Sequence, residues 1–352
     1  MSTVSLKKAA LCALAVASSL HVFSAPAKDF TEQAFLSQPL GHGVYELAYD
    51  NSQKTLYAAS APSFDKDKTT GLVFRLVADS LQINEKIATE RRAFALSLDE
   101  ENHILYLGNA LDGSLTLVDT QTNKVIQTLQ LSDDLDPEKQ AHVREVVLDK
   151  PNQRLYVSGI GRKGKGLLWV VDTRKQQLIE TLNNIEPVGF AVDASADKVY
   201  VVTGKGELVT LDGKTSKLLF RVKVDPAESD HYFLNIALNT AAGVGYIADT
   251  NNRDVLVVQL DSGKLVDRIA SPNSIAVLYH AGRDEIYVTH RNDRSISIID
   301  AKTNHLKHTI KTAAMPNSLA LSADGGTLYA SVKQDEKSNL ADYVLKIDLT
   351  KF

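Results

Sequence analysis

One short pattern recurs seven times along this chain. An apolar stretch that ends in tyrosine returns at intervals of 49, 50, 44, 46, 41 and 42 residues. Its tyrosines are Tyr57, Tyr106, Tyr156, Tyr200, Tyr246, Tyr287 and Tyr329. A period of about 40–50 residues is typical of propeller proteins, in which each repeat is one small sheet. The spacing therefore predicts seven blades.

Each repeat has the anatomy of a four-stranded sheet. In the last copy a strand at 318–321 is followed by a turn at 323–326 and then by the Tyr329 strand. In other copies a third strand ends in Asp, as at Asp119 and Asp300, and a fourth strand follows a polar turn. Short strands separated by turn residues predict antiparallel hairpins. We therefore predict an all-β fold, a seven-bladed β-propeller with four-stranded antiparallel blades.

The two ends of the chain complement each other. The seventh repeat stops after its third strand, at residues 348–352, and residues 34–37 precede the first complete repeat. An N-terminal strand that completed the last blade would remove an unpaired edge and close the ring. We therefore predict a single domain over residues 28–352, with its ring closed by the N-terminal strand.

The first strands, aligned on the tyrosines, contain two columns of packing residues. The first column is large and apolar: Leu47, Leu96, Val146, Phe190, Ile236, Ile275 and Leu319. The second is mostly small: Ala48, Ser97, Val147, Ala191, Ala237, Ala276 and Ala320. Because side chains alternate along a strand, we expect the large residues to fill the gaps between blades. The small residues would then sit where the inner strands converge on the central channel.

Two further columns lie earlier on the same strands, toward the mouth of the channel. The nearer one is Glu46, Ala95, Glu145, Gly189, Asn235, Ser274 and Ser318. The one before it is Tyr45, Phe94, Arg144, Val188, Leu234, Asn273 and Asn317. Polar groups at the centre of a ring either coordinate a ligand or hold ordered water. The sequence leaves both interpretations open.

The N-terminus has the pattern of a secretory signal peptide. Lys7 and Lys8 precede an apolar run at 9–20, and a small-x-small site follows at 25–27. The run is too short to span a bilayer, which needs about 20 residues, so no membrane insertion is expected. The single cysteine, Cys12, lies inside this segment. We predict that residues 1–27 are removed and that the mature protein is periplasmic and without disulfides.

The overall charge argues against a general attraction for polyanions. The formal net charge is −4, and removal of residues 1–27 takes away two lysines and no acid, which leaves −6. An anion site would therefore have to be local. Long irregular segments at 61–71, 131–142, 159–166, 225–232 and 332–342 are expected on one face of the ring. Variable loops on a rigid scaffold commonly carry function.

That face combines cations with rings and amides. The predicted anion-binding residues are Arg91, Arg92, Arg144, Arg162, Lys163, Lys165 and Arg291. The predicted stacking and polar residues are Phe94, His142, His231, Tyr232, Phe233, Asn235, Asn273, His290 and Asn317. Positive charge beside aromatic surface is the combination that holds single-stranded nucleic acid. Acidic residues at 133–136 on the same side favour an ordinary solvated rim instead.

Other motifs carry little weight. Residues 159–164 match G-x-G-x-x-G, but a strand follows where a nucleotide loop needs a helix. His142, His231 and His290 fall on three different blades, and we expect no metal site and no cofactor. Glu46 and Glu145 offer two carboxyl groups for acid–base chemistry, although nothing in the sequence sets their separation.

Several stretches resemble a known family. Residues 155–161 (LYVSGIG), 169–172 (WVVD), 287–291 (YVTHR) and 316–325 (PNSLALSADG) resemble the YncE-like periplasmic propellers, which have YVTN-type repeats, and residues 41–49 agree. The resemblance implies a seven-bladed periplasmic propeller that binds DNA, with a preference for single strands. It implies no enzymatic activity.

Three functions follow as hypotheses. The first is a periplasmic protein, expected to be a monomer, that binds single-stranded DNA through one loop face without catalysis. The second is a platform for protein–protein interaction in the cell envelope. The third is a hydrolase or lyase that works in the channel with Glu46 and Glu145.

Overall fold

The structure is a computed structural model, and it describes residues 34–352 apart from 66, 134–140, 162–165, 228–229 and 336. The segment predicted as a signal peptide lies outside the described residues. The described residues belong to one compact unit, Gln33–Phe352. Among them, no helix has the length and apolar character that crossing a membrane requires.

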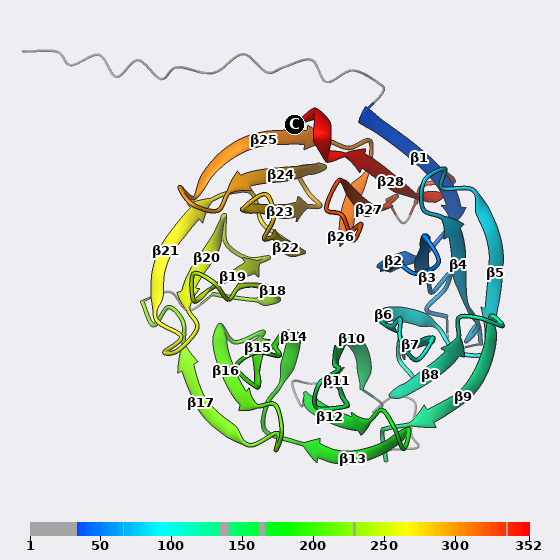
Figure 1. The fold of residues 1–352 in the computed structure, drawn as a ribbon, viewed down its shortest axis with the longest axis horizontal. Helices are drawn as coiled ribbons and strands as arrows, with labels where there is room; N and C mark the ends of the chain where they lie inside the picture. The colour runs from blue at the N-terminus through cyan, green and yellow to red at the C-terminus, as the bar shows by residue number, and fades with distance from the viewer. Residues whose placement is uncertain (1–33, 66, 134–140, 162–165, 228–229, 336) are drawn as a thin grey trace, which may run out of the picture. The chain divides into compact units, whose positions relative to one another are not determined.

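Seven four-stranded antiparallel sheets follow one another around a ring (Figure 1). Blade 1 contains β2 (Val44–Asp50), β3 (Thr55–Ser60), β4 (Gly71–Val77) and β5 (Ile83–Thr89). Blade 2 contains β6 (Ala93–Asp99), β7 (Ile104–Asn109), β8 (Ser114–Asp119) and β9 (Lys124–Gln130). Blade 3 contains β10 (His142–Asp149), β11 (Arg154–Ile160), β12 (Leu167–Asp172) and β13 (Gln177–Leu182). The strand β12 confirms that no helix follows the glycine-rich loop.

The remaining blades repeat this order. Blade 4 contains β14 (Pro187–Asp193), β15 (Lys198–Thr203), β16 (Glu207–Asp212) and β17 (Leu218–Lys223). Blade 5 contains β18 (Phe233–Asn239), β19 (Val244–Asp249), β20 (Asp254–Gln259) and β21 (Leu265–Ala270). Blade 6 contains β22 (Val277–His280), β23 (Glu285–His290), β24 (Ser295–Asp300) and β25 (His305–Lys311). Blade 7 contains β26 (Met315–Leu321), β27 (Thr327–Lys333), β28 (Asp342–Asp348) and β1 (Phe35–Gly41), and a 3-10 turn (Leu349–Lys351) follows β28.

Blade 7 joins the two ends of the described chain. Its sheet has the order β1-β28-β27-β26, and β1 pairs antiparallel with β28 from Phe35 opposite Ile347 to Gly41 opposite Asp342. Both the seven-bladed fold and its closure by an N-terminal strand are thereby confirmed. The closure leaves no blade short of its outer strand.

The repeated tyrosines are core residues. All seven are at most 2% exposed and rank among the largest fully buried side chains. Some of their hydroxyls also tie blades together. Tyr156 of blade 3 donates to the carbonyl of Gly213 in blade 4 at 3.0 Å, and Tyr329 of blade 7 donates to Ala78 in blade 1 at 3.2 Å. Each of these bonds satisfies a buried hydroxyl and connects two neighbouring blades.

The packing columns pair across the blade interfaces. Leu47 of blade 1 lies in one apolar cluster with Ala320 of blade 7, and Leu96 of blade 2 packs with Ala48 of blade 1. Phe190 packs likewise with the preceding blade's Val147. Each small residue therefore makes room for the large residue of the next blade. Of the small column, Ala276 borders the central cavity.

Aspartates shape the tight turns on the face away from the long loops. Asp99 and Asp149 end first strands, and a carboxylate oxygen of each accepts the backbone N–H three residues later. Asp119 and Asp300 end third strands and accept from the N–H groups two and three residues later. This is the local hydrogen bonding that favours Asp in turns. The repeated Asp positions are thus structural.

Candidate functional site

β-Bulges open the inner strands at the end where the long loops lie. In blade 1 the register with β3 shifts between Val44 and Leu47, and in blade 3 the register with β11 shifts between Val143 and Val146. Equivalent shifts occur in blades 2, 4, 5 and 7. A bulge redirects side chains at the rim of a sheet. In blades 1, 3 and 7 the bulge contains residues of both mouth columns, and in blades 2, 4 and 5 it contains the residue of the column that begins with Tyr45.

Hydroxyl groups hold several bulges in place. Ser158 accepts the Glu145 N–H at 2.8 Å, and Ser331 accepts the Ser318 N–H at 3.0 Å. Both serines lie two residues after a repeat tyrosine. On the seam between blades 7 and 1, Ser331, Ser318 and Asn317 all donate to the Tyr45 carbonyl, at 2.6, 2.9 and 3.3 Å. The backbone at the centre of the ring is therefore fixed by side chains that the repeat places there.

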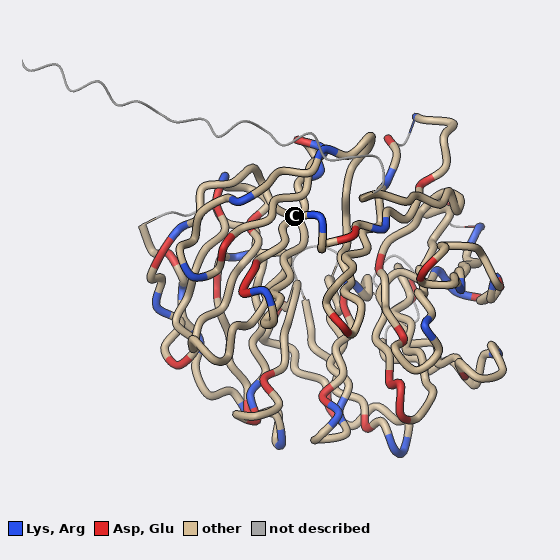
Figure 2. The backbone as a smooth tube through the Cα atoms, turned by 45° about the horizontal axis from the view of Figure 1, so that its top comes forward, with Lys and Arg blue, Asp and Glu red and all other residues tan. Residues whose placement is uncertain are grey.

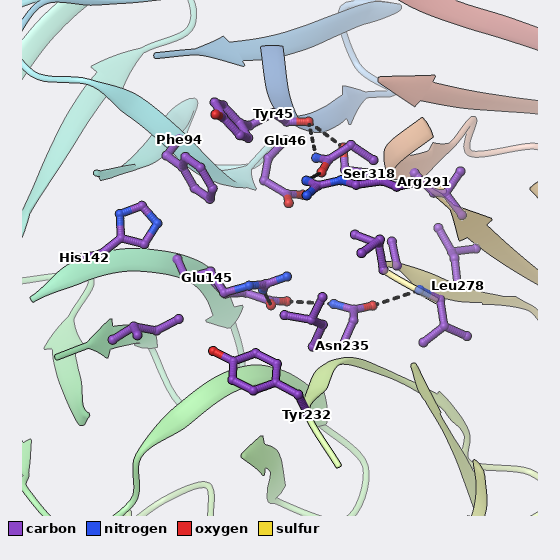
Figure 3. A pocket seen from close by; sticks show the side chains of 18 residues that line it. Tyr45, Glu46, Phe94, His142, Glu145, Tyr232, Asn235, Leu278, Arg291 and Ser318 are labelled. Atoms are coloured by element: carbon purple, nitrogen blue, oxygen red, sulfur yellow. Dashed lines mark hydrogen bonds and ion pairs between the residues drawn. The ribbon is translucent and has the colours of Figure 1, made fainter. Parts of the chain in front are cut away.

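The bulges surround a cavity of about 390 Å³, which we call the central mouth (Figure 3). Rings, charges, amides and apolar groups share its lining. The lining residues are Tyr45, Glu46, Phe94, His142, Arg144, Glu145, Ile160, Tyr232, Leu234, Asn235, Ile275, Ala276, Val277, Leu278, Arg291, Asn317, Ser318 and Leu319. Half of them come from the two mouth columns, so column position in the repeat did indicate where the site lies.

Two arginines and two carboxyl groups meet in the mouth. The Arg144 guanidinium donates to the Glu145 carboxylate at 2.7 Å and to the Val188 carbonyl at 3.3 Å. Asn235 also donates to Glu145, at 3.3 Å. Arg291 donates to the Asn317 side chain. Blades 3, 5, 6 and 7 thus each contribute a polar group to the mouth.

Burial shifts the pKa values of these groups. It raises the pKa of Glu145 to about 8, against the lowering effect of Arg144 and with a further rise from the charge of Glu46. Burial also raises the pKa of Glu46, opposed by Arg144 and Arg291. The pKa of His142 falls to about 4, through burial and then through the Arg144 charge. At pH 7 His142 is neutral and Glu145 is mostly protonated, so the mouth carries excess positive charge within an acidic chain.

Aromatic rings form a continuous string along one side of the mouth. Tyr45 and Phe94 pack with ring centroids 4.1 Å apart. Phe94 meets His142 edge-on at 4.7 Å, and Tyr45 meets Phe64 edge-on at 6.0 Å. The Lys333 ammonium lies 3.8 Å from the Tyr45 ring centroid. Tyr232 lies across the mouth from Tyr45 and Phe94 (Figure 3).

The structure brings together seven of the predicted site residues. Arg144 and Arg291 of the predicted anion-binding set line the mouth, as do five of the stacking and polar set: Phe94, His142, Tyr232, Asn235 and Asn317. Arg91 is 40% exposed outside the mouth and lies 3.4 Å from Asp112. Asn273 is half-buried and donates to the Thr250 carbonyl at 2.9 Å. Arg162, Lys163 and Lys165 lie outside the described residues.

Four other predicted site residues are interior side chains. Arg92 is 3% exposed, and its guanidinium donates to the carbonyls of Ser63 and Asp65 at 2.9 and 2.5 Å, which secures the 61–71 loop. Phe233 is fully buried, so neither face of its ring is open to a base. The same burial removes His231 and His290 from the candidate set.

His231 and His290 have internal partners. The Nδ1 of His231 lies 2.5 Å from the Asp249 carboxylate, and its Nε2 lies 3.5 Å from the Asp225 carboxylate. The Nε2 of His290 lies 2.8 Å from the Ser297 hydroxyl. Within the described part of the chain, no group of three or more His, Cys, Asp and Glu side chains is arranged to hold a metal ion.

Sequence reasoning left two aromatic residues out of the candidate set. Tyr45 stands in the same column as Phe94 and Arg144, and that position was the signal for it. Phe64 is 41% exposed in the loop after β3, and its edge-on contact with Tyr45 connects it to the mouth. Charged residues of both signs are otherwise interspersed over the blades (Figure 2), so the mouth is distinguished by arrangement and not by a broad basic surface.

Comparison with known proteins places this architecture in a family. YncE of Salmonella typhi is 35% identical over 347 residues, which cover 96% of this chain and 96% of that protein. YncE of Escherichia coli strain K12 is 35% identical over 332 residues, 91% of this chain and 93% of that protein. The chain belongs to the YncE family. No family model matches it. With more than nine-tenths of each chain aligned, the relationship covers the whole ring and not a single repeat.

Proposed function

We propose that this chain is an exported binding protein of the bacterial envelope, and that its central mouth holds single-stranded DNA without catalysis. Export and a periplasmic location rest on the N-terminal pattern of residues 1–27. The observation that carries the binding proposal is the mouth itself, where Arg144 and Arg291 lie beside the string of rings that includes Tyr45 and Phe94.

The chemistry of the mouth suits a single strand better than a duplex. Guanidinium groups pair with phosphate through charge-assisted hydrogen bonds. Every base has a π-face that stacks on an aromatic ring, and unpaired strands expose those faces. In a duplex the bases are already stacked on one another, so Tyr45, Phe94 and Tyr232 would have nothing to bind. We therefore expect a preference for single strands.

The test is a fluorescence-anisotropy titration of the mature protein with one labelled oligonucleotide, single-stranded and then annealed, at two salt concentrations. Single-strand binding that is tighter than duplex binding and weakens with salt supports the proposal. Arg253→Ala is the matched control, because Arg253 is an exposed arginine outside the mouth. No binding at low salt, or equal binding of both forms, contradicts it.

A second function is favoured by one observation, the meeting of Glu46 and Glu145 in the mouth with both pKa values raised by burial. A protonated carboxyl group beside a second carboxyl is the minimum for acid–base chemistry. A hydrolase or lyase of this kind would lose its activity in a Glu46→Gln, Glu145→Gln double variant. Unchanged turnover in that variant would remove the hypothesis.

A further inference from the structure

The aromatic string leads from the surface to the central mouth. Its outer member, Phe64, is 41% exposed on the loop between β3 and β4. Tyr45 and then Phe94 continue it inward, and His142 ends it in the mouth, with centroid distances of 6.0, 4.1 and 4.7 Å between successive rings. The four rings come from blades 1, 2 and 3. Tyr45 already has Phe94 and the Lys333 ammonium against its ring, so within this row it is the exposed Phe64 that offers a stacking position to a base.

The central mouth itself has room for one small group. Its volume of about 390 Å³ is at the lower end of the range for small-molecule pockets, about 300–1,000 Å³. Blades 6 and 7 contribute the apolar side chains of Ile275, Leu278 and Leu319 beside Arg291 and Asn317. A run of several nucleotides would not fit in this volume. The mouth is therefore matched to a single unit at the end of the string.

Two buried polar atoms of the mouth point to a ligand. The Nε of Arg291 and the Nδ1 of His142 are both inaccessible to solvent, and neither has a hydrogen-bond partner among the described residues. A buried polar group left without a partner costs roughly 1–3 kcal/mol. Arg291 is a donor and His142 is neutral at pH 7, so together they suit an anion with a neutral polar group beside it.

We propose that the central mouth takes the terminal nucleotide of a DNA single strand, with its phosphate at Arg144 and Arg291 and its base against Tyr232. The nucleotide before it stacks on Phe64, the exposed outer ring of the string. This inference rests on the proposed function and adds to it that the protein recognises a strand end. A free mononucleotide presents the same phosphate and base, so the experiment has to separate the two sources.

The direct test compares one oligonucleotide in linear and in covalently circularised form, each displacing a labelled linear strand from the full mature chain. The circle has every phosphate and base but no end. We expect the circle to bind at least about tenfold more weakly, which corresponds to the loss of one stacked, charge-paired nucleotide. Equal affinity of circle and line overturns the inference and leaves single-strand binding intact. If neither form binds, the proposed function fails instead.

A second measurement probes the mouth without a strand. Calorimetric titration with a deoxynucleoside monophosphate should show binding that Tyr232→Leu abolishes and that Phe64→Ala leaves unchanged, because Phe64 is on the outer string. Phe64→Ala should weaken binding of the linear strand and leave binding of the mononucleotide unchanged. A mononucleotide that fails to bind, or to displace the strand, overturns the inference. The inference is also overturned if a short peptide with a C-terminal Phe and a free carboxylate displaces the labelled strand better than the mononucleotide does. That result would assign the mouth to the end of a polypeptide.

Discussion

Two regions of this ring bring together the same kinds of side chain and use them differently. The central mouth has Arg144, Arg291, His142 and two glutamates. A second cluster, between blades 4 and 5, has Arg268, His231, Asp225 and Asp249, with Asn252, and we call it the blade-5 cluster.

The difference lies in how many partners each group already has. In the blade-5 cluster Asp249 accepts hydrogen bonds from the backbone of Tyr232 and Asn251, from the Asn252 side chain at 2.9 Å and from His231. In the mouth Arg291 Nε and His142 Nδ1 have no partner within the described part of the chain. In the blade-5 cluster His231 Nε2 also lacks a hydrogen-bond partner among the described residues, although the Asp225 carboxylate lies 3.5 Å from it. A cluster whose carboxylate is satisfied internally stabilises a fold, whereas unpaired buried atoms beside a cavity suit a ligand.

The largest expected effect breaks the blade-5 cluster. Asp249→Ala leaves His231 and two backbone N–H groups without their acceptor in the interior, and we expect the free energy of unfolding to fall by about 3–5 kcal/mol. Urea unfolding followed by tryptophan fluorescence measures it. The matched change in the mouth, Arg144→Ala, should cost under about 1 kcal/mol, because the half-buried Glu145 can remain protonated. If both variants lost a similar amount of unfolding free energy, the blade-5 cluster and the central mouth would not differ in their contribution to stability.

The second prediction concerns DNA affinity, which should depend on the central mouth and not on the blade-5 cluster. The Arg144→Gln, Arg291→Gln double variant should bind single-stranded DNA about thirtyfold more weakly, since it removes two phosphate contacts. The slope of log affinity against log salt should also fall, by about 1.4 for two contacts on a single strand. Arg268→Gln should leave the affinity of the folded protein unchanged. A salt slope that stays the same in the double variant would show that these arginines do not meet phosphate.

The third prediction concerns pH. The pKa of Glu145 is raised from 4.5 to about 8 in the folded state, so folding takes up a proton at any pH between these values. This group's contribution to stability is complete below about pH 4.5 and is lost as pH rises to 8. Glu145→Gln should therefore gain in unfolding free energy relative to the parent between pH 5 and 8, by roughly 1–2 kcal/mol.

Binding should follow the same titration. Ionisation of Glu145 adds a negative charge beside Arg144 and Glu46, while His142 is already neutral, so DNA affinity should decrease from pH 6 to pH 9. Anisotropy titrations across this range should show a decrease in the parent and a flat profile in Glu145→Gln. Parallel profiles in the two proteins would remove Glu145 as the titrating group.

The smallest expected effect is at the rim. Arg91 is exposed and already 3.4 Å from Asp112. We expect Arg91→Ala to weaken single-strand binding by no more than about twofold at low salt, and the difference to vanish at higher salt, as for other screened surface charges. If Arg91→Ala lost as much affinity as the variant without the mouth arginines, the binding surface would lie on the loop face and not in the mouth.

The period of the tyrosines was sufficient to predict the fold, because each repeat must bury the same large ring in the same place. Closure by β1 was predictable for the same reason, since the last repeat lacked its outer strand. The columns that contain Tyr45, Glu46 and Arg144 also indicated where the mouth would be. Simple alternation along the strand failed there, because the bulges between residues 44 and 47 and between 143 and 146 break it.

What the sequence could not provide was which candidates point inward. His231 and Phe233 directly precede and follow Tyr232, yet only Tyr232 of the three lines the mouth. Arg91 and Arg92 are likewise neighbours with opposite exposure. Such choices depend on partners distant in sequence, such as Asp249 for His231 and Ser63 for Arg92. Residue type and spacing alone do not specify those partners.

The pairing of β1 with β28 also has a consequence for how the chain reaches this structure. Phe35 contacts its partner strand at Ile347, so the last blade needs both extremities of the polypeptide at once. Contacts between such distant residues form slowly, because a long loop must close first. Until these two strands meet, the ring has an unpaired edge at blade 7. We expect ring closure to be a late step of folding, and loss of either β1 or β28 to leave an open arc with an exposed strand edge that is prone to aggregation.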